Sequence, residues 1–201
     1  IKDPKTARRS VESILAEVVI TKACGWEIGF ISGGIASFTH EELLSLLESV
    51  FKITKQKQWI NIGILGRRQL QEYKPYIKGV CGTVETVNEA VHKKVCPTKP
   101  VEPVISMFKL CDELGLQKSI TIIIGLGEEE KDIPKLIEFI KTYSVDKITF
   151  YALNPHEGTG FENGPDSDYY VTWVRETRKA FPKVHITAGC WVDRIETGEI
   201  K

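Results

Sequence analysis

Short apolar runs alternate with amphipathic stretches along this chain. Runs rich in Ile, Val and Phe that are bounded by glycine or polar residues predict strands, and apolar residues every three to four positions predict helices. The predicted strands lie at 26–32, 59–65, 80–85, 119–125, 147–153 and 184–189. The predicted helices lie at 3–25, 39–51, 68–77, 131–141 and 168–181, with a helical region up to Leu114 that is interrupted at 97–103.

Two of the predicted helices have recognisable start signals. Asp3 followed by Pro4 is typical of an N-cap with proline at the first helical position. Thr39 and Glu42 have the spacing of a capping box, in which each side chain bonds the other residue's backbone amide. These signals predict where the first two helices begin.

Strands that alternate with helices favour right-handed βαβ units around a parallel sheet, and therefore an α/β fold. A doubly wound open sheet and a (βα) barrel share this pattern, but a barrel is favoured because nearly every predicted strand ends in residues suited to face a ligand. We expect a single domain over 1–201, an N-terminally incomplete TIM-type barrel. The strand ends in question are Ser32-Gly33-Gly34, Thr83 with Glu85, Gly125-Leu126-Gly127-Glu128, Asn154, and Gly189-Cys190.

Overall charge and hydropathy narrow the classes of partner. The 27 basic residues balance the 27 acidic ones, so the net charge favours neither a nucleic-acid nor a membrane-surface partner. No apolar run approaches the roughly 20 residues of a membrane-spanning helix, and the first residues lack the apolar core of a signal peptide. We therefore expect a cytoplasmic protein that binds neither nucleic acid nor membrane.

The five cysteines, at 24, 81, 96, 111 and 190, form no close cluster. Metal-binding loops need closely spaced cysteines, so the chain itself is expected to hold no metal. For Cys24, Cys81 and Cys111 the bland interpretation, a buried reduced thiol, is favoured.

Taken singly, the strand-end motifs have structural interpretations. Gly33-Gly34 is compatible with a tight turn, and Gly125-x-Gly127 with a close approach of backbone to a neighbouring helix. Acidic residues such as Glu128 are favoured near a helix start in any case. Glu85, a carboxylate directly after an apolar strand, is also a suitable acceptor for a ribose diol.

Together, in this order, the motifs resemble those of the radical S-adenosylmethionine (SAM) superfamily, in the group of biotin synthase, the [FeFe]-hydrogenase maturase, methylornithine synthase and lipoyl synthase. Ser32-Gly33-Gly34 resembles the family's glycine motif, and G-T-V-E-T its ribose-binding segment. I-I-I-G-L-G-E resembles the adenine motif, and L-N-P-H-E-G-T-G-F-E the motif of the sixth strand.

The resemblance implies roles for individual residues. The glycine motif would hold the methionine amino group of SAM. The polar residues of G-T-V-E-T would bind the ribose, and the backbone of the adenine motif would lie against the base. The cofactor-binding residues implied are Ser32, Gly33, Gly34, Thr83, Glu85, Ile124, Gly125, Leu126 and Asn154.

The sequence departs from the family pattern in two places. Ile35 stands where many relatives carry glutamate, so no carboxylate contact to the amino group is available there. The family also ligates a [4Fe–4S] cluster through three closely spaced cysteines after the first strand, and neither that strand nor that loop is found here. We expect these cysteines upstream of Ile1, with SAM and the cluster as the cofactors.

The resemblance implies reductive cleavage of SAM and hydrogen abstraction in cofactor biosynthesis, with sulfur insertion or metallocofactor assembly favoured. It also implies a small-molecule or protein-bound acyl substrate and an electron donor such as ferredoxin or flavodoxin. A non-catalytic module that binds SAM or a partner is the alternative. A Schiff-base aldolase is disfavoured because Lys147 lies at a strand start, the wrong end of a barrel.

The resemblance also implies substrate residues on the last predicted strands. Because A-G-C-W-V-D-R resembles the final-strand region of biotin synthase, Cys190 is the catalytic candidate, as a cluster ligand, a sulfur carrier or a hydrogen-atom donor, although packing beneath a loop is the simpler interpretation. Asn61, His156 and Arg194 are the candidate substrate-pocket residues. Asn61 alternates with apolar residues and would need a hydrogen-bond partner if buried, while His156 is also compatible with a surface loop.

Overall fold

A computed structural model describes residues 8–34 and 38–189 of the chain. The Cα positions divide the chain into two compact units. The first unit comprises Ile1–Cys81 and Met107–Gln117, and the second comprises Gly82–Ser106 and Lys118–Lys201. Strand β3 and helix α6 contribute residues to both units, and so does β4, whose first residue, Gln117, belongs to the first unit.

The described part of the first unit includes helix α2, whose N-cap Ser10 accepts a hydrogen bond from the Ser13 amide. Helix α3 has the predicted capping box: the Glu42 amide donates to Thr39 Oγ1 at 3.2 Å, and the Thr39 amide donates to Glu42 Oε2 at 2.8 Å. The capping-box prediction is therefore confirmed. The elements here are α2 (Val11–Ala23), β1 (Ile31–Ser32), α3 (His40–Thr54), β2 (Gln58–Asn61), α4 (Arg67–Tyr73), β3 (Ile77–Glu85) and α6 (Glu102–Leu114).

The second unit continues the alternation of strands and helices. Asn88 caps α5 through its side-chain oxygen, and Asp166 caps α8 in the same way. The elements are α5 (Glu89–Val95), β4 (Gln117–Ile124), η1 (Glu130–Asp132), α7 (Ile133–Thr142), β5 (Lys147–Ala152), α8 (Ser167–Ala180) and β6 (His185–Gly189).

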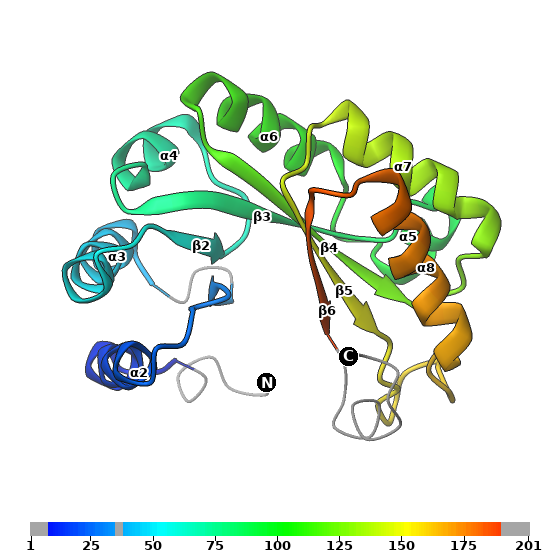
Figure 1. Ribbon diagram of the computed structural model, residues 1–201, viewed down its shortest axis with the longest axis horizontal. Helices are drawn as coiled ribbons and strands as arrows, with labels where there is room; N and C mark the ends of the chain where they lie inside the picture. Colours follow the sequence, from blue (N-terminus) through cyan, green and yellow to red (C-terminus); the bar gives the residue numbers. More distant parts are fainter. Residues whose placement is uncertain (1–7, 35–37, 190–201) are drawn as a thin grey trace. The chain divides into compact units, whose positions relative to one another are not determined.

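The strands follow one another in hydrogen-bonded order β1-β2-β3-β4-β5-β6 (Figure 1). The pairs β1·β2, β2·β3, β4·β5 and β5·β6 are parallel. Neighbouring parallel strands in chain order are what successive βαβ units produce. The α/β class is confirmed.

Apolar side chains from strands and helices fill the interior of each unit. In the first, Leu47 and Val50 of α3 and Leu70 of α4 are buried with Ile60 of β2. In the second, the β-branched run of β4 and Phe150 of β5 are covered by the helices; the fully buried helical residues include Leu136, Ile140, Tyr170 and Trp173. Continuous apolar strands of this kind are typical of sheets covered by helices.

The structure corrects predictions of extent and burial. Residues 8–10 are not helical, so of the helix predicted at 3–25 the described residues form only Val11–Ala23, behind the N-cap Ser10, and the predicted start signal at Asp3 lies outside them. The first strand is only Ile31–Ser32, because backbone pairing with β2 is limited to Ile60 and Asn61. Cys24 is exposed rather than buried because it lies at the C-cap of α2, while Cys81 and Cys111 are buried as predicted.

Within the described ranges, we find no helix that combines the length and the apolar character needed to cross a bilayer.

Candidate functional site

The turn after β1 brings three of the predicted residues together. Ser32 is paired in register with Asn61 at the end of β2, and the Gly33 amide donates to the Asn61 carbonyl at 3.1 Å. Asn61 is half-buried, and Ser32 and Gly33 are exposed. Ser32 and Gly33, predicted to bind the cofactor, therefore lie beside Asn61, predicted to line the substrate pocket, at adjacent strand ends in the first unit.

The space around Gly33 is open. Among the described residues, a Cβ built on Gly33 would meet only Ile62 Cγ2, at 4.0 Å, which is ordinary van der Waals contact. Gly33 and Gly34 line cavities of about 750 Å³ and about 210 Å³. The packing of the chain does not explain glycine at position 33, and a ligand that occupies this space would.

Glu85, at the end of β3, has an unusual backbone. Its φ is +64°, in the left-handed region where residues with a Cβ are rarely found. Its side chain is only 13% exposed, and one carboxylate oxygen accepts a hydrogen bond from Lys99 Nζ at 3.3 Å. Such local strain is concentrated at ligand sites, which is consistent with the predicted ribose contact. The Lys99 ammonium orients the Glu85 carboxylate and compensates its charge.

Cys96 lies close to this ion pair but is not activated by it. Burial raises the pKa of the Cys96 thiol, the negative charge of Glu85 raises it further, and Lys99 offsets only part of the change. A raised pKa keeps the sulfur protonated at neutral pH and therefore weakly nucleophilic. We assign no reaction step to Cys96.

The glycine turn after β4 is occupied by a side chain of its own. The buried Glu128 carboxylate accepts hydrogen bonds from the amides of Gly125 at 2.6 Å and Leu126 at 2.9 Å. Because both amides are already bonded, they are not available to a ligand. Glu128 caps the turn rather than the start of a helix.

Gly125 is required by the fold itself. Its φ is +105°, and a Cβ at this position would come within 2.8 Å of Pro165 Cδ and 3.2 Å of Leu153 Cβ. Ile124, the residue before it, is fully buried. The predicted contact of Ile124 with adenine could therefore involve only its backbone.

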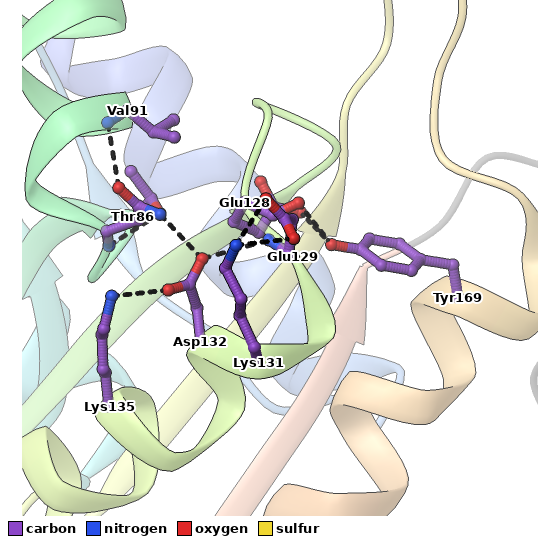
Figure 2. A network of polar contacts seen from close by, with 9 residues as sticks. Thr86, Val91, Glu128, Glu129, Lys131, Asp132, Lys135 and Tyr169 are labelled. Carbon is purple, nitrogen blue, oxygen red and sulfur yellow. Dashed lines mark hydrogen bonds and ion pairs between the residues drawn. The ribbon is translucent and has the colours of Figure 1, made fainter.

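A network of hydrogen bonds around Asp132 lies next to this turn, as Figure 2 shows. The fully buried Asp132 carboxylate accepts hydrogen bonds from Asn88 Nδ2 at 2.7 Å, the Glu129 amide at 3.1 Å and Lys135 Nζ at 2.7 Å. Burial alone would raise the pKa of Asp132, but these three donors outweigh it and lower the pKa to about 2. The ionised Asp132 thus links the start of α5 to the start of α7 through hydrogen bonds.

Tyr169 of α8 closes the other side of the network (Figure 2). Its hydroxyl donates to the Glu128 carbonyl at 2.7 Å and lies 3.4 Å from Glu128 Oε1. Burial and the neighbouring glutamate raise the pKa of Tyr169 to about 12, so the phenol remains protonated and can serve as a donor.

The remaining predicted residues are more dispersed. Thr83 and Asn154 are half-buried, whereas His156 is exposed in the loop after β5, where its carbonyl accepts hydrogen bonds from Thr159. Cys190 and Arg194 lie outside the described residues. For residues 8–34 and 38–189, no group of three or more His, Cys, Asp or Glu side chains is arranged to hold a metal ion.

Sequence reasoning missed Lys99, Asn88, Asp132 and Tyr169. Asn88 had a visible signal, since Asn before a helical pattern is a favoured N-cap. The others had none, because Lys99 is 14 residues from Glu85, and Asp132 is 44 residues from Asn88.

Comparison with known proteins identifies the family. A profile of the Radical SAM superfamily matches residues 1–140. An uncharacterised protein of Methanocaldococcus jannaschii is 42% identical over 97% of this chain and 54% of its own length, and a biotin synthase of Methanococcus vannielii is 29% identical over 75% and 46%. The chain thus spans about half the length of the curated relatives it matches.

A solved structure agrees in fold. Streptococcus suis SuiB bound to S-adenosylmethionine superposes with a TM-score of 0.73 at 15% sequence identity, over 96% of this chain and 46% of SuiB. This agreement confirms the predicted partial (βα) barrel of the radical SAM kind. With a family profile over most of its length and a relative that is 42% identical, the chain belongs to the radical SAM superfamily, in its biotin synthase-like group.

Proposed function

We propose that this chain forms the core of a radical SAM enzyme that acts in cofactor biosynthesis, by sulfur insertion or metallocofactor assembly. The observation that carries the proposal is the open space around Gly33. Among the described residues, no packing contact requires a glycine at this position. Bare backbone beside open cavities accommodates the amino-acid end of SAM. Family membership makes SAM the cofactor to test first.

The proposal assigns the nucleoside of SAM residue by residue. Glu85 accepts hydrogen bonds from the ribose hydroxyls, and Lys99 holds its carboxylate in place. Since Glu128 occupies the amides of Gly125 and Leu126, adenine contacts at this turn come from carbonyl oxygens and Cα atoms. Thr83 and Asn154 complete the polar contacts.

The described residues offer no ligand set for an iron–sulfur cluster, so no residue here is assigned to it. In the family, the cluster and SAM together supply a 5′-deoxyadenosyl radical that abstracts hydrogen from a substrate. The contribution of this chain is to bind SAM, to orient it and to exclude water from it. An acyl substrate and a ferredoxin- or flavodoxin-type electron donor belong to the same proposal, with Asn61 and His156 on the substrate side.

The first experiment measures SAM binding by equilibrium dialysis to the full-length protein and two variants. Gly33→Val is expected to weaken SAM binding at least about tenfold, because its side chain fills the ligand space, and to leave the unfolding midpoint unchanged. Gly66→Val is the matched control, because a Cβ at Gly66 likewise meets one atom in ordinary contact, Gln69 Oε1 at 3.9 Å, and Gly66 lines neither cavity. Unchanged affinity in Gly33→Val would contradict the assignment of this turn.

The second experiment tests the chemistry. Full-length protein is purified without oxygen, reconstituted with iron and sulfide, and mixed with SAM and dithionite, and 5′-deoxyadenosine is quantified. Formation above a cluster-free control supports the radical enzyme. Absence of the product with a fully loaded cluster and measured SAM binding would instead favour the non-catalytic SAM-binding module.

A further inference from the structure

A separate cavity of about 550 Å³ lies within the second unit. One wall is α5, another is α7, and the first turns of α6 with Pro97 and Pro100 form a third. Val84 and Thr86, at the end of β3, also line it. The volume falls within the range of small-molecule sites.

The cavity is lined by one face of each helix. Glu89, His92 and Cys96 of the α5 segment recur at helical spacing, as do Phe139 and Tyr143 of α7. The rings of Phe139 and Tyr143 pack with centroids 4.6 Å apart and remain half-buried. With Val101 and Ile105 of the α6 segment, they give the cavity an apolar lining.

His92 is the polar group inside this lining. It is 7% exposed, and its Nε2 atom has no hydrogen-bond partner among the residues that the structure describes. A buried polar atom without a partner costs about 1–3 kcal/mol and calls for an explanation. Because His92 lines the cavity, a bound molecule can supply the missing partner.

Four charged side chains line the cavity, and all of them are exposed: Lys93, Lys135, Glu89 and Glu102. Lys135 is already paired with Asp132, so these groups provide no excess positive charge, and water screens them. The buried imidazole therefore decides the chemistry of the ligand. An imidazole N–H donates a stronger hydrogen bond to an anionic oxygen than to a neutral one, because a charged acceptor strengthens the bond.

We propose that this cavity binds a small aryl or acyl carboxylate, with its apolar body against Phe139 and Ile105 and its carboxylate on His92 Nε2. The site is distinct from the one proposed for SAM. None of the residues assigned to SAM lines the cavity, although Val84 and Thr86 flank Glu85 in sequence. The proposal therefore does not depend on the radical chemistry.

The test is calorimetric titration of the full-length protein with 4-phenylbutyrate and with its neutral amide. We expect 4-phenylbutyrate to bind with a millimolar or lower Kd, as suits a ligand of this size, and the amide to bind about tenfold more weakly. His92→Leu should weaken carboxylate binding at least about tenfold without lowering the unfolding midpoint, because it removes an unpartnered polar atom. Ile105→Trp, which fills the cavity, should abolish binding of both probes.

Two further variants keep the test decisive. Lys94→Ala is the matched control, because Lys94 lies on α5 beside Lys93 but does not line the cavity, and its affinities should equal those of the parent. Phe139→Ala changes a half-buried wall residue and should weaken both probes about tenfold even if His92→Leu fails to fold. No binding of either probe up to about 10 mM would overturn the site. Equal affinity for acid and amide, or unchanged affinity in Phe139→Ala, would overturn it as well.

Discussion

Two glycine turns in this chain look alike in sequence, but different forces explain them. At the turn after β4, Gly125 has a φ of +105° and lies so close to Pro165 that any side chain would collide with it. At the turn after β1, a Cβ on Gly33 would meet a single atom of the part of the chain that the structure describes, at 4.0 Å. The fold therefore requires the first glycine and does not require the second.

The backbone amides of the two turns differ as well. Glu128 takes the amides of Gly125 and Leu126, and Tyr169 holds Glu128 from α8, so the β4 turn is a closed structural unit. At the β1 turn, the Gly33 amide donates to the carbonyl of Asn61 on the neighbouring strand, and the turn lies beside open cavities. A glycine motif is evidence for a ligand only where the protein's own packing leaves it unexplained.

The largest expected effect is on Gly125. Gly125→Ala should lower the free energy of unfolding by about 3 kcal/mol, because it adds the cost of a left-handed alanine to an overlap with Pro165. Gly158→Ala is the control, since Gly158 has a φ of +81° but no atom within 4 Å of a built Cβ. Urea denaturation of both variants separates the backbone cost from the packing cost. Equal losses in the two variants would show that the overlap with Pro165 is relieved at no cost.

A second test concerns the support of the β4 turn at low pH. Asp132 has a folded-state pKa of about 2 against an ordinary value of 3.8, so its ionisation stabilises the fold above about pH 4, and this contribution is lost as the pH falls toward 2. The difference corresponds to roughly 2 kcal/mol. Asp132→Asn should lose about that much at pH 7 and show a flatter decline of stability between pH 4 and pH 2.

The control for this test is Asp168→Asn, because Asp168 is an exposed aspartate in the first turn of α8. Its acid dependence should match that of the parent protein. An Asp132→Asn variant with the parent's acid dependence would mean that another carboxylate controls unfolding in this pH range.

These contrasts also show what could be predicted from sequence. The β-branched run at 119–125 and the Thr39–Glu42 capping box are local signals, and both elements form as expected. The predicted first strand, 26–32, is too long because a strand exists only where a partner backbone pairs with it, and within that range only Ile31 and Ser32 pair with β2.

The candidate site was predicted at the level of motifs but not of contacts. Gly33 and Gly125 carry the same sequence signal, and the contact that most constrains Gly125 comes from Pro165, 40 residues further along. The bond between Asn88 and Asp132 and the ion pair of Glu85 with Lys99 are likewise tertiary contacts. Residue spacing along one chain contains no information on such pairs.

A smaller effect is expected at Tyr169, which joins α8 to the β4 turn. Tyr169→Phe removes the hydrogen bond to the Glu128 carbonyl and should lower the free energy of unfolding by about 1 kcal/mol. Tyr143→Phe, a similar change of a half-buried tyrosine on α7, should have less effect on stability. If the two variants have the same unfolding temperature, the hydroxyl of Tyr169 does not contribute to the stability of the turn.

The smallest effect is expected at the ion pair of Glu85 with Lys99, and there it falls on binding rather than on stability. The Lys99 side chain is 54% exposed, so solvent limits the interaction to about 1 kcal/mol, and Lys99→Met should weaken SAM binding by no more than about fivefold with no change in unfolding. Lys99→Arg should restore the affinity because it preserves the charge beside Glu85. Equilibrium dialysis with Glu85→Gln in parallel separates two failures. If Glu85→Gln binds SAM as the parent does, the ribose assignment is wrong. If Glu85→Gln loses affinity while Lys99→Met does not, Glu85 binds SAM without the help of Lys99, and its left-handed backbone alone sets the position of the carboxylate.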